Sequence, residues 1–384
     1  MDFGLNEEQQ MLVDAARKLH EKFVEPLLAA HDRDRPLPRP AVLSLLDKLS
    51  GLGLTSARIP EAGGGMGMKM LDYGLLVEQF PPTIGLIMQP HEGTTTRIYF
   101  GGSEEQRERF VPDLMAGRRI GATGSTEPDV GSDPRGVKTT ATPDGQRMLL
   151  SGRKQWISNA SVCDVMYVTC RIPDGTGGFR MGRVLVERDV SPFQVQEVDM
   201  MGLRQAPLGE VLFDRCEVPA ANVCPESDDT ARLLTITWLS NRPTVGLMAV
   251  HLAQRAFDMA RAYAGVRKQF GKPIGAFQLV QADLAEMETL IVTARLTCYH
   301  ALAALDRGER ANGLSAMAKR YAVDACDRAI QLAMRVHGAM GLSRDLGLEQ
   351  MARDVRTLAI PDGTPGILAL IQGREITGLD PFRT

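Results

Sequence analysis

The chain has 384 residues, of which 44% are hydrophobic and 24% are charged, and its formal net charge is −3. This composition is ordinary for a globular protein and excludes a disordered chain, a coiled-coil rod and a collagen-like fibre. The small net charge gives no electrostatic reason to expect binding to nucleic acid or to an anionic membrane. A chain of this length favours two or three structural cores over a single one.

Composition also bears on the compartment. The sequence contains no run of apolar residues long enough to predict a membrane-spanning helix. Its first residues lack the basic and apolar regions of a signal peptide. The six cysteines form no Cys-x-x-Cys pair and are too sparse for a disulfide framework. We therefore expect reduced thiols and a cytoplasmic protein.

The N-terminal part of the chain has the pattern of helices. Asn6 and Gln9 have the spacing of an N-terminal capping box. The apolar residues that follow at steps of three and four are Leu12, Ala15, Leu19 and Phe23. They predict one buried stripe on a helix that is broken by Pro26. Another helix is expected over residues 42–52. The glycine-rich segment 59–67 does not fit Gly-x-Gly-x-x-Gly and is predicted as a turn.

From residue 120 to about residue 224 the pattern changes to short strands. The clearest β-rich runs are residues 166–172, 183–187, 193–198 and 210–213. Clusters of glycine, proline and aspartate separate them. Several short strands at close spacing predict a small barrel or sandwich and not a parallel α/β sheet.

Beyond residue 230 the helical period returns strongly. Apolar and small residues recur at steps of three and four over residues 250–264, 284–305 and 318–336. So many small residues favour close helix packing, as in a four-helix bundle. We therefore predict an α+β fold with three domains. These are an N-terminal all-α domain at 1–119, a central small β-barrel or sandwich domain at 120–224 and a C-terminal four-helix bundle domain at 225–384.

Common catalytic motifs are missing from the sequence. The six histidines share no metal-ligand spacing, so no metal site is expected. No P-loop, Rossmann fingerprint or Gly-x-Ser-x-Gly motif occurs, which argues against the commonest hydrolases and nicotinamide-dependent folds.

Two segments of the β-rich region could carry chemistry. Residues 123–133 combine hydroxyl side chains, glycines and turn-forming acids, which can present donors to a flavin edge or a phosphate. Residues 154–159 contain Trp156 and Ser158, which point to the same side of a strand. An indole beside a hydroxyl can stack on an aromatic ring and donate to its edge. From composition alone, a polar turn and a packed strand are the plainer interpretations.

Together the two segments resemble the acyl-CoA dehydrogenase family. The family pattern near the flavin is Thr-Glu-Pro-x-x-Gly-Ser-Asp, followed later by Lys-x-Trp-Ile-Thr-Asn. This chain has both in that order, with Ser158 in place of the usual threonine. Further matches occur in order at residues 100–106, 213–219, 267–273, 277–278, 337–341 and 360–364. The resemblance covers residues 5–378, which is nearly the whole chain.

The resemblance implies FAD, bound non-covalently between subunits of a homodimer or homotetramer. The residues implied to contact the flavin of their own subunit are Thr123, Ser125, Thr126, Gly131, Ser132, Trp156, Ile157 and Ser158. Those implied to serve or complete a neighbouring subunit's FAD pocket are Arg267, Phe270, Gln278, Arg335, Gly338, Ala339 and Thr364. The residues implied to bind substrate are Ser132, Arg242 and Gly363.

The implied reaction is α,β-dehydrogenation of an acyl thioester, carried by CoA or by a carrier protein. Asp362 stands at the position of the catalytic base and would remove the α proton, while a hydride passes from the β carbon to flavin N5. The electrons would then pass to an electron-transfer flavoprotein.

The sequence departs from the family pattern at several positions. Asp362 is one methylene shorter than the usual glutamate. Asn241, which precedes Arg242, cannot be the base that some members carry there, because an amide does not accept a proton in this role. The other departures are Leu239, Arg335 and Gly366.

These departures leave alternatives open. One is a flavin oxidase or monooxygenase on the same fold, although nitroalkane oxidases pair their aspartate with an arginine seven residues on, where this chain has Ala369. Another is a non-catalytic flavoprotein or scaffold. His91 or Glu92 could act as a second acid or base, but an ordinary polar helix end is the favoured interpretation. Asp362 could also merely cap the helix that starts near Pro365.

Overall fold

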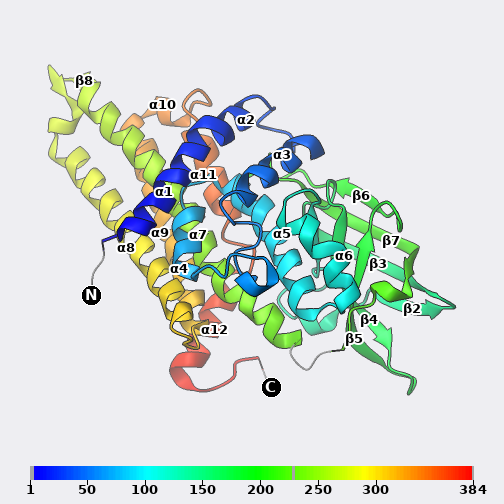
Figure 1. Cartoon of the computed structure of the whole chain (residues 1–384). Helices are drawn as coiled ribbons and strands as arrows, with labels where there is room; N and C mark the ends of the chain where they lie inside the picture. Colours follow the sequence, from blue (N-terminus) through cyan, green and yellow to red (C-terminus); the bar gives the residue numbers. More distant parts are fainter. Residues whose placement is uncertain (1–3, 227–229, 383–384) are drawn as a thin grey trace.

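In the computed structural model, which describes residues 4–226 and 230–382, helices from both ends of the chain pack together and the sheet of the middle part lies at one side of them (Figure 1). The N-terminal elements are α1 (Glu7–Leu19), η1 (His20–Val24), α2 (Glu25–Ala29), α3 (Arg39–Ser50), η2 (Glu61–Gly63), α4 (Met70–Val77), α5 (Pro82–Gly101) and α6 (Glu104–Met115). The capping box at Asn6 and Gln9 is confirmed, with Gln9 N donating to Asn6 Oδ1 over 2.8 Å.

The predicted stripe of the first helix is right at three of its four positions, since Leu12, Leu19 and Phe23 pack against the core. Val13 and Ala16 are buried, whereas Ala15 is exposed. Pro26 does not break the helix either, because a π-helical turn precedes it and the proline occupies the first turn of α2. The chain therefore stays helical through the proline, from Glu7 to Ala29.

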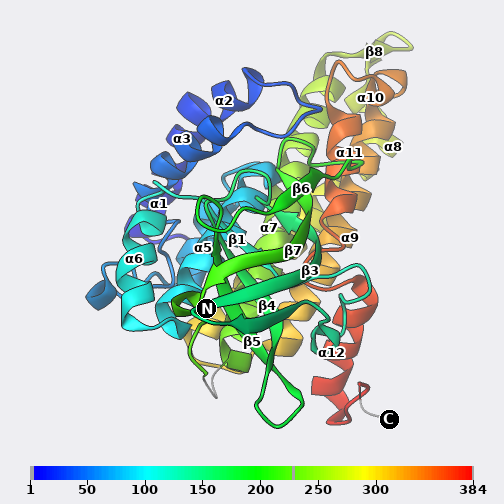
Figure 2. The same ribbon diagram turned by 90° about the vertical axis from the view of Figure 1, so that its right-hand side faces the viewer.

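The middle of the chain forms one curled sheet of seven strands. The strands are β1 (Gly121–Gly124), β2 (Thr140–Asp144), β3 (Arg147–Ser158), β4 (Val165–Pro173), β5 (Phe179–Glu187), β6 (Gln194–Glu197) and β7 (Leu208–Pro219), with short helices η3 (Pro134–Gly136) and η4 (Ala220–Asn222). Their order is β1-β4-β2-β3-β7-β6, and β5 pairs with β4. The four β-rich runs are confirmed as β4 to β7, and Figure 2 shows β3 and β7 side by side at the front.

Long helices make up the C-terminal part. The elements are α7 (Thr230–Val266), β8 (Lys268–Gln269), β9 (Lys272–Pro273), η5 (Ile274–Ala276), α8 (Gln278–Asp306), α9 (Asn312–His337), α10 (Ala339–Leu342), α11 (Leu348–Thr357) and α12 (Pro365–Thr377). Gly246 of α7 faces α8 and α9 so closely that a Cβ would lie 2.6 Å from Cys298 Sγ and 3.1 Å from the Ala322 side chain. The predicted close packing of small residues and the α+β fold class are therefore confirmed.

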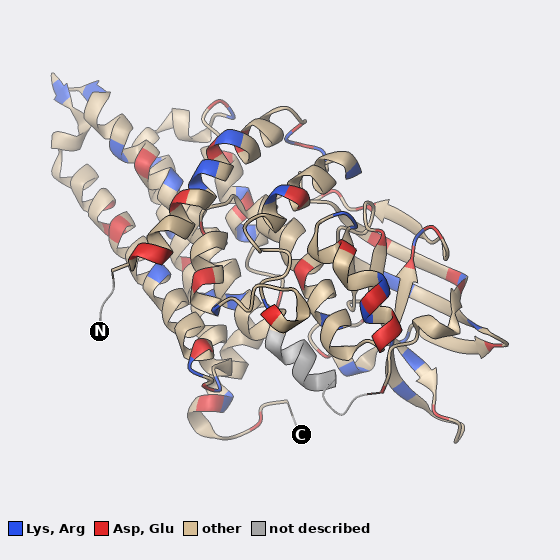
Figure 3. Ribbon diagram, in the orientation of Figure 1, with Lys and Arg blue, Asp and Glu red and all other residues tan. Residues whose placement is uncertain are grey.

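Charged residues of both signs are interspersed over helices and strands (Figure 3). The six cysteines are buried and form no disulfide. None of the helices in the described part of the chain is both long and apolar enough to cross a bilayer.

A buried histidine joins the helical N-terminal part to the sheet. Gly121 N of β1 donates to His91 Nδ1 over 3.1 Å, and His91 Nε2 lies 2.9 Å from the carbonyl oxygen of Leu114 at the end of α6. Burial lowers the pKa of His91 to about 4. His251 of α7 is partly buried, with Nδ1 2.9 Å from the Glu78 carbonyl oxygen, and desolvation of its ring lowers its pKa to about 4.

Acid should therefore destabilise the fold through these rings. Between pH 6.5 and pH 4 the unfolded chain binds protons that the folded chain rejects, so stability falls as the pH falls, by up to about 3 kcal/mol for each histidine. His251→Leu should reduce this loss, measured by urea unfolding at pH 7 and pH 4.5. The exposed His300→Gln is the control. Burial raises the pKa of Asp354 to about 6, which acts in the opposite direction, so only the difference between variants isolates His251.

Candidate functional site

A strained turn between α11 and α12 presents Asp362. The residue has a φ of 55°, in the left-handed region that non-glycine residues rarely adopt. Its neighbour Gly363 has a φ of 116°. Thr364 caps α12, since its hydroxyl accepts from Ile367 N over 3.4 Å. The interpretation of Asp362 as the helix cap is therefore wrong, because the hydroxyl of Thr364 takes that place. A strained backbone of this kind persists only where the surrounding structure holds it.

Lys319 of α9 holds the turn on both sides of Asp362. Its side chain is fully buried, and Nζ donates to the carbonyl oxygens of Ala359 at 3.1 Å, Gly363 at 2.7 Å and also Pro361. Burial lowers the pKa of Lys319 to about 8, against the opposing effect of Asp362. The ammonium thus replaces its water shell with three backbone acceptors of one turn.

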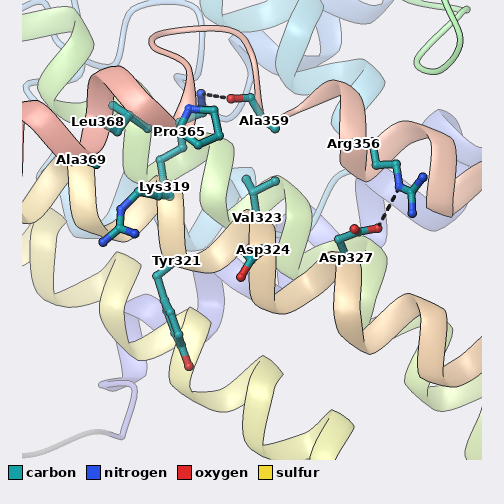
Figure 4. Close-up of a pocket in the computed structure, with 11 residues that line it drawn as sticks. Lys319, Tyr321, Val323, Asp324, Asp327, Arg356, Ala359, Pro365, Leu368 and Ala369 are labelled. Carbon is teal, nitrogen blue, oxygen red and sulfur yellow. Dashed lines mark hydrogen bonds and ion pairs between the residues drawn. The ribbon is translucent and has the colours of Figure 1, made fainter.

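A second cation binds the same turn from α7. Arg242 is buried, and its Nε donates to the carbonyl oxygen of Asp362 over 3.0 Å. The backbone around Asp362 is therefore fixed by α7 as well as by α9. Beside the turn is a cavity of about 410 Å³ between α9, α11 and α12, lined by Lys319 and Pro365 among others but not by Asp362 (Figure 4).

Two further buried arginines lie near Asp362. Arg58 pairs with the fully buried Glu92 of α5, and its Nη2 donates to Ser240 Oγ and Asn241 Oδ1, both over 2.7 Å. Arg97 donates to Thr123 and Thr237. Asp362 raises the pKa of both arginines, although burial lowers each pKa more strongly.

Neither His91 nor Glu92 is placed as a second acid or base. Both ring nitrogens of His91 are engaged by backbone groups. Glu92 pairs with Arg58 and accepts from Thr96 Oγ1 over 2.8 Å. These contacts favour a structural role for both side chains.

The structure brings the two sequence segments of the β-rich region together. Glu127 pairs with the buried Lys154 of β3 over 2.8 Å and accepts from the backbone N–H groups of Lys138 and Thr139. Lys154 Nζ also donates to the Ser125 carbonyl oxygen over 3.2 Å. The loop is thereby pinned against the strand, and Gln155 N donates to the carbonyl oxygen of Thr126 over 3.0 Å.

Trp156 stands out of the sheet at this point. The pairing of β3 with β7 shifts register between Lys154 and Ile157, and Trp156 has a φ of 60°. The indole is 49% exposed, whereas the Ile157 side chain lies in the core with 2% exposed. Ile157 can therefore offer only backbone groups to a ligand. Ser132 is exposed, and a Cβ on Gly131 would meet no atom within 4 Å.

Most of the remaining predicted cofactor residues gather at the far end of the bundle, away from the sheet (Figures 1 and 2). Phe270 is 94% exposed at the tip between β8 and β9, next to Arg267 and the start of α8 at Gln278. Arg335 reaches Asp283 of α8, with Nε 3.0 Å from Oδ2, and Gly338 and Ala339 follow on the chain.

Thr364 is not part of that group within one chain. It lies in the turn held by Lys319, whereas Arg335 is 16 residues further along α9. That separation is about 24 Å along a helix.

Sequence reasoning missed the buried charges that shape this site. Lys319 lies three residues before Ala322, on the apolar stripe of α9, so a lysine on a buried face was a visible signal. Arg58 and Arg97 had no such signal, because Arg58 lies in a loop and nearly all of α5 is buried. Within the described ranges, no group of three or more histidine, cysteine or acidic residues could hold a metal ion.

Three family models match the chain in sequence. They are the N-terminal, middle and C-terminal domains of acyl-CoA dehydrogenase, over residues 6–118, 122–216 and 235–377. A probable acyl-CoA dehydrogenase of Bacillus subtilis (strain 168) is 31% identical, and the alignment covers 98% of this chain and 100% of the relative. A glutaryl-CoA dehydrogenase of Desulfococcus multivorans is 32% identical over 99% of both chains.

A solved structure supports the same fold. It comes from work on the electron transferring flavoprotein of Acidaminococcus fermentans and superimposes with a TM-score of 0.89. It is 30% identical and covers 98% of this chain and 100% of the other.

Replacing Lys319 with methionine should loosen the turn. The methyl end fills part of the space but leaves three carbonyl groups without their donor, which should cost about 3 kcal/mol of stability. Hydrogen exchange of the Gly363 and Thr364 amides should speed up in the Lys319→Met variant. The adjacent exposed Arg320→Met is the control. Unchanged exchange at both amides would show that the ammonium does not hold the turn.

Proposed function

Because the chain belongs to the acyl-CoA dehydrogenase family, whose members are FAD-dependent oxidoreductases acting on CH–CH groups, we propose that it oxidises an acyl thioester with Asp362 as the base. The thioester would lose hydrogen from its α and β carbons. The observation that carries this proposal is the Asp362 turn, which Lys319 and Arg242 hold from two helices. A positioned carboxylate is what proton removal from carbon requires.

The residues present fit a bound flavin. A half-exposed indole on a bulged strand, beside a loop with exposed hydroxyl and glycine positions, offers both a stacking surface and donors. We assign contacts with the flavin of the same subunit to Thr123, Ser125, Thr126, Gly131, Ser132, Trp156, Ser158 and the backbone of Ile157. When bound, FAD supplies the acceptor for the hydride that leaves the β carbon.

The chain's own residues handle the proton and the charge. The α C–H bond breaks, the proton passes to a carboxylate oxygen of Asp362, and its electron pair forms the new double bond. Negative charge develops on the thioester oxygen as the proton leaves. Arg242 and Lys319 are fixed in place before the reaction, so their positive charges can favour that charge without a reorganisation cost. Ser132, Arg242 and Gly363 are assigned to substrate binding.

The bundle tip supports an assembly of subunits. Several apolar residues of this part of the chain are exposed, with Val266 at 75%, Phe270 at 94% and Leu279 at 82%, and an exposed apolar region of this kind indicates a protein contact. We propose that Arg267, Phe270 and Gln278 contact the FAD of a second subunit in a homodimer or homotetramer. Arg335, Gly338 and Ala339 would complete that site, whereas Thr364, which lies in the turn held by Lys319, would contact the FAD of its own subunit. The matched structure from work on an electron transferring flavoprotein supports such a flavoprotein as the electron acceptor.

Asp362→Asn tests the base. The variant should fold, hold FAD and bind thioester, while substrate-dependent bleaching of the flavin slows at least about 100-fold, because an amide cannot accept the proton. Anaerobic stopped-flow absorbance with a panel of acyl-CoA thioesters measures this. Asp324→Asn, an exposed position on α9, is the matched control. Bleaching by the Asp362→Asn variant at the unmodified rate would remove Asp362 from the mechanism.

Trp156→Ala tests the cofactor surface. Loss of ring stacking should weaken FAD retention about five- to tenfold, measured as flavin released on dilution and gel filtration. Phe179→Ala is a suitable control, because Phe179 is an aromatic residue on β5 that is 44% exposed. Equal retention by both variants would place the flavin elsewhere.

A further inference from the structure

Arg97 of α5 is a buried guanidinium without a balancing acid. The residue is only 5% exposed. Its Nη1 donates to Thr123 Oγ1 over 3.0 Å and its Nη2 donates to Thr237 Oγ1 over 2.8 Å. Its Nε has no hydrogen-bond partner, and no carboxylate pairs with Arg97 among the described residues. Leaving a buried charge unpaired costs several kcal/mol, so such a group is kept where something pairs with it.

Arg58 shows how the same chain satisfies a buried arginine. Its guanidinium has a carboxylate partner in Glu92, and Ser240 and Asn241 take up the remaining donors. Arg97 has two hydroxyl groups in place of that set. The difference is in the partners, since both arginines are almost fully buried.

Counting charges around Asp362 gives an excess of positive charge. Its field acts on four buried or nearly buried cations, Arg58, Arg97, Arg242 and Lys319. The acids in this group are Glu92 and Asp362, so four positive charges less two negative charges leave +2. Burial lowers the pKa of Arg97 to about 10, and the charge of Asp362 opposes this effect only in part. An excess of buried positive charge favours a ligand that brings negative charge with it.

The position of Arg97 points to the substrate. Thr123 lies in β1, at the start of the segment assigned to the flavin, and Thr237 is one turn before the Ser240–Arg242 segment of α7. Arg242 in turn contacts the Asp362 backbone. Arg97 therefore lies among the elements that would enclose the acyl group.

We propose that Arg97 binds a carboxylate carried by the acyl group, so that the substrate is the thioester of a dicarboxylic acid. The proposal rests on the proposed function for the place of the acyl group. A guanidinium offers parallel N–H donors that suit a carboxylate, and the unpartnered Nε is one of them. The substrate would thus supply one of the two missing negative charges.

Binding measurements separate this proposal from the reaction itself. The FAD-loaded Asp362→Asn variant, which should bind without turnover, is titrated by calorimetry with succinyl-, glutaryl- and adipyl-CoA. Butyryl-, pentanoyl- and hexanoyl-CoA are the neutral partners with matched carbon number. At least one dicarboxylic thioester should bind roughly 10- to 100-fold more tightly than its neutral match, as expected for a charged hydrogen-bonded pair.

Arg97→Gln in the same background should abolish that preference and leave the affinity for the neutral thioesters within about twofold. Arg97→Lys keeps the positive charge but loses the parallel N–H donors of the guanidinium. This variant should therefore retain part of the preference. It also covers the case in which the glutamine variant does not fold. Arg320→Gln is the exposed control. FAD content and the flavin spectrum should be unchanged in both Arg97 variants.

Several results would overturn the proposal. Equal affinity for each matched pair, or no binding of the dicarboxylic thioesters, would do so. An equal loss for charged and neutral thioesters in Arg97→Gln would mean that Arg97 contacts a phosphate of CoA. A loss of FAD with an unchanged preference would assign Arg97 to the cofactor. A failure of the proposed function would give a separate result. The unmodified protein would then show no flavin bleaching with any thioester, whatever its binding preference.

Discussion

The contact on which this site depends is the bond between one buried ammonium and three carbonyl oxygens. Lys319 brings a positive charge into the interior, and the Ala359, Pro361 and Gly363 carbonyl groups replace the water that it loses. Because these acceptors bracket Asp362, the bond also fixes a backbone conformation that is unfavourable in isolation. The hydrogen bonds of Lys319 therefore both stabilise the bundle and position the carboxylate.

Other buried charges repeat this arrangement. The Glu127–Lys154 pair joins the loop after β1 to β3, and the Arg58–Glu92 pair joins a loop to α5 and α7. In each case a charged group satisfies backbone or hydroxyl partners from segments far apart in sequence. Such networks stabilise little relative to apolar packing, but they tolerate few alternative arrangements. They are suited to fixing the relative positions of residues from the N-terminal, middle and C-terminal parts of the chain.

Periodicity predicted the elements well where one face of a helix or strand is buried. The stripes of α8 and α9 and the strands β4 to β7 are examples. In the first helix it placed Leu12, Leu19 and Phe23 against the core correctly, but it missed Val13 and Ala16, which are buried, in favour of Ala15, which is exposed. The site was predictable only through the resemblance of its motifs to a family. The roles of Lys319, Arg58 and Arg97 depend on contacts across more than 20 residues, and local patterns carry no record of these.

The close approach of α7 to α9 has a consequence for the chemistry. Gly246 lies one turn after Arg242 on α7, and Ala322 lies one turn after Lys319 on α9. The contact between Gly246 and Ala322 therefore sets the spacing of the two helices close to Arg242 and Lys319, which hold the Asp362 turn. An added methyl group at Gly246 would act as a wedge between the helices. The gap between the two cations would widen, and the backbone of the Asp362 turn could not keep its hydrogen bonds to both Arg242 and Lys319. The spacing of Arg242 and Lys319 thus depends on the absence of a side chain at Gly246.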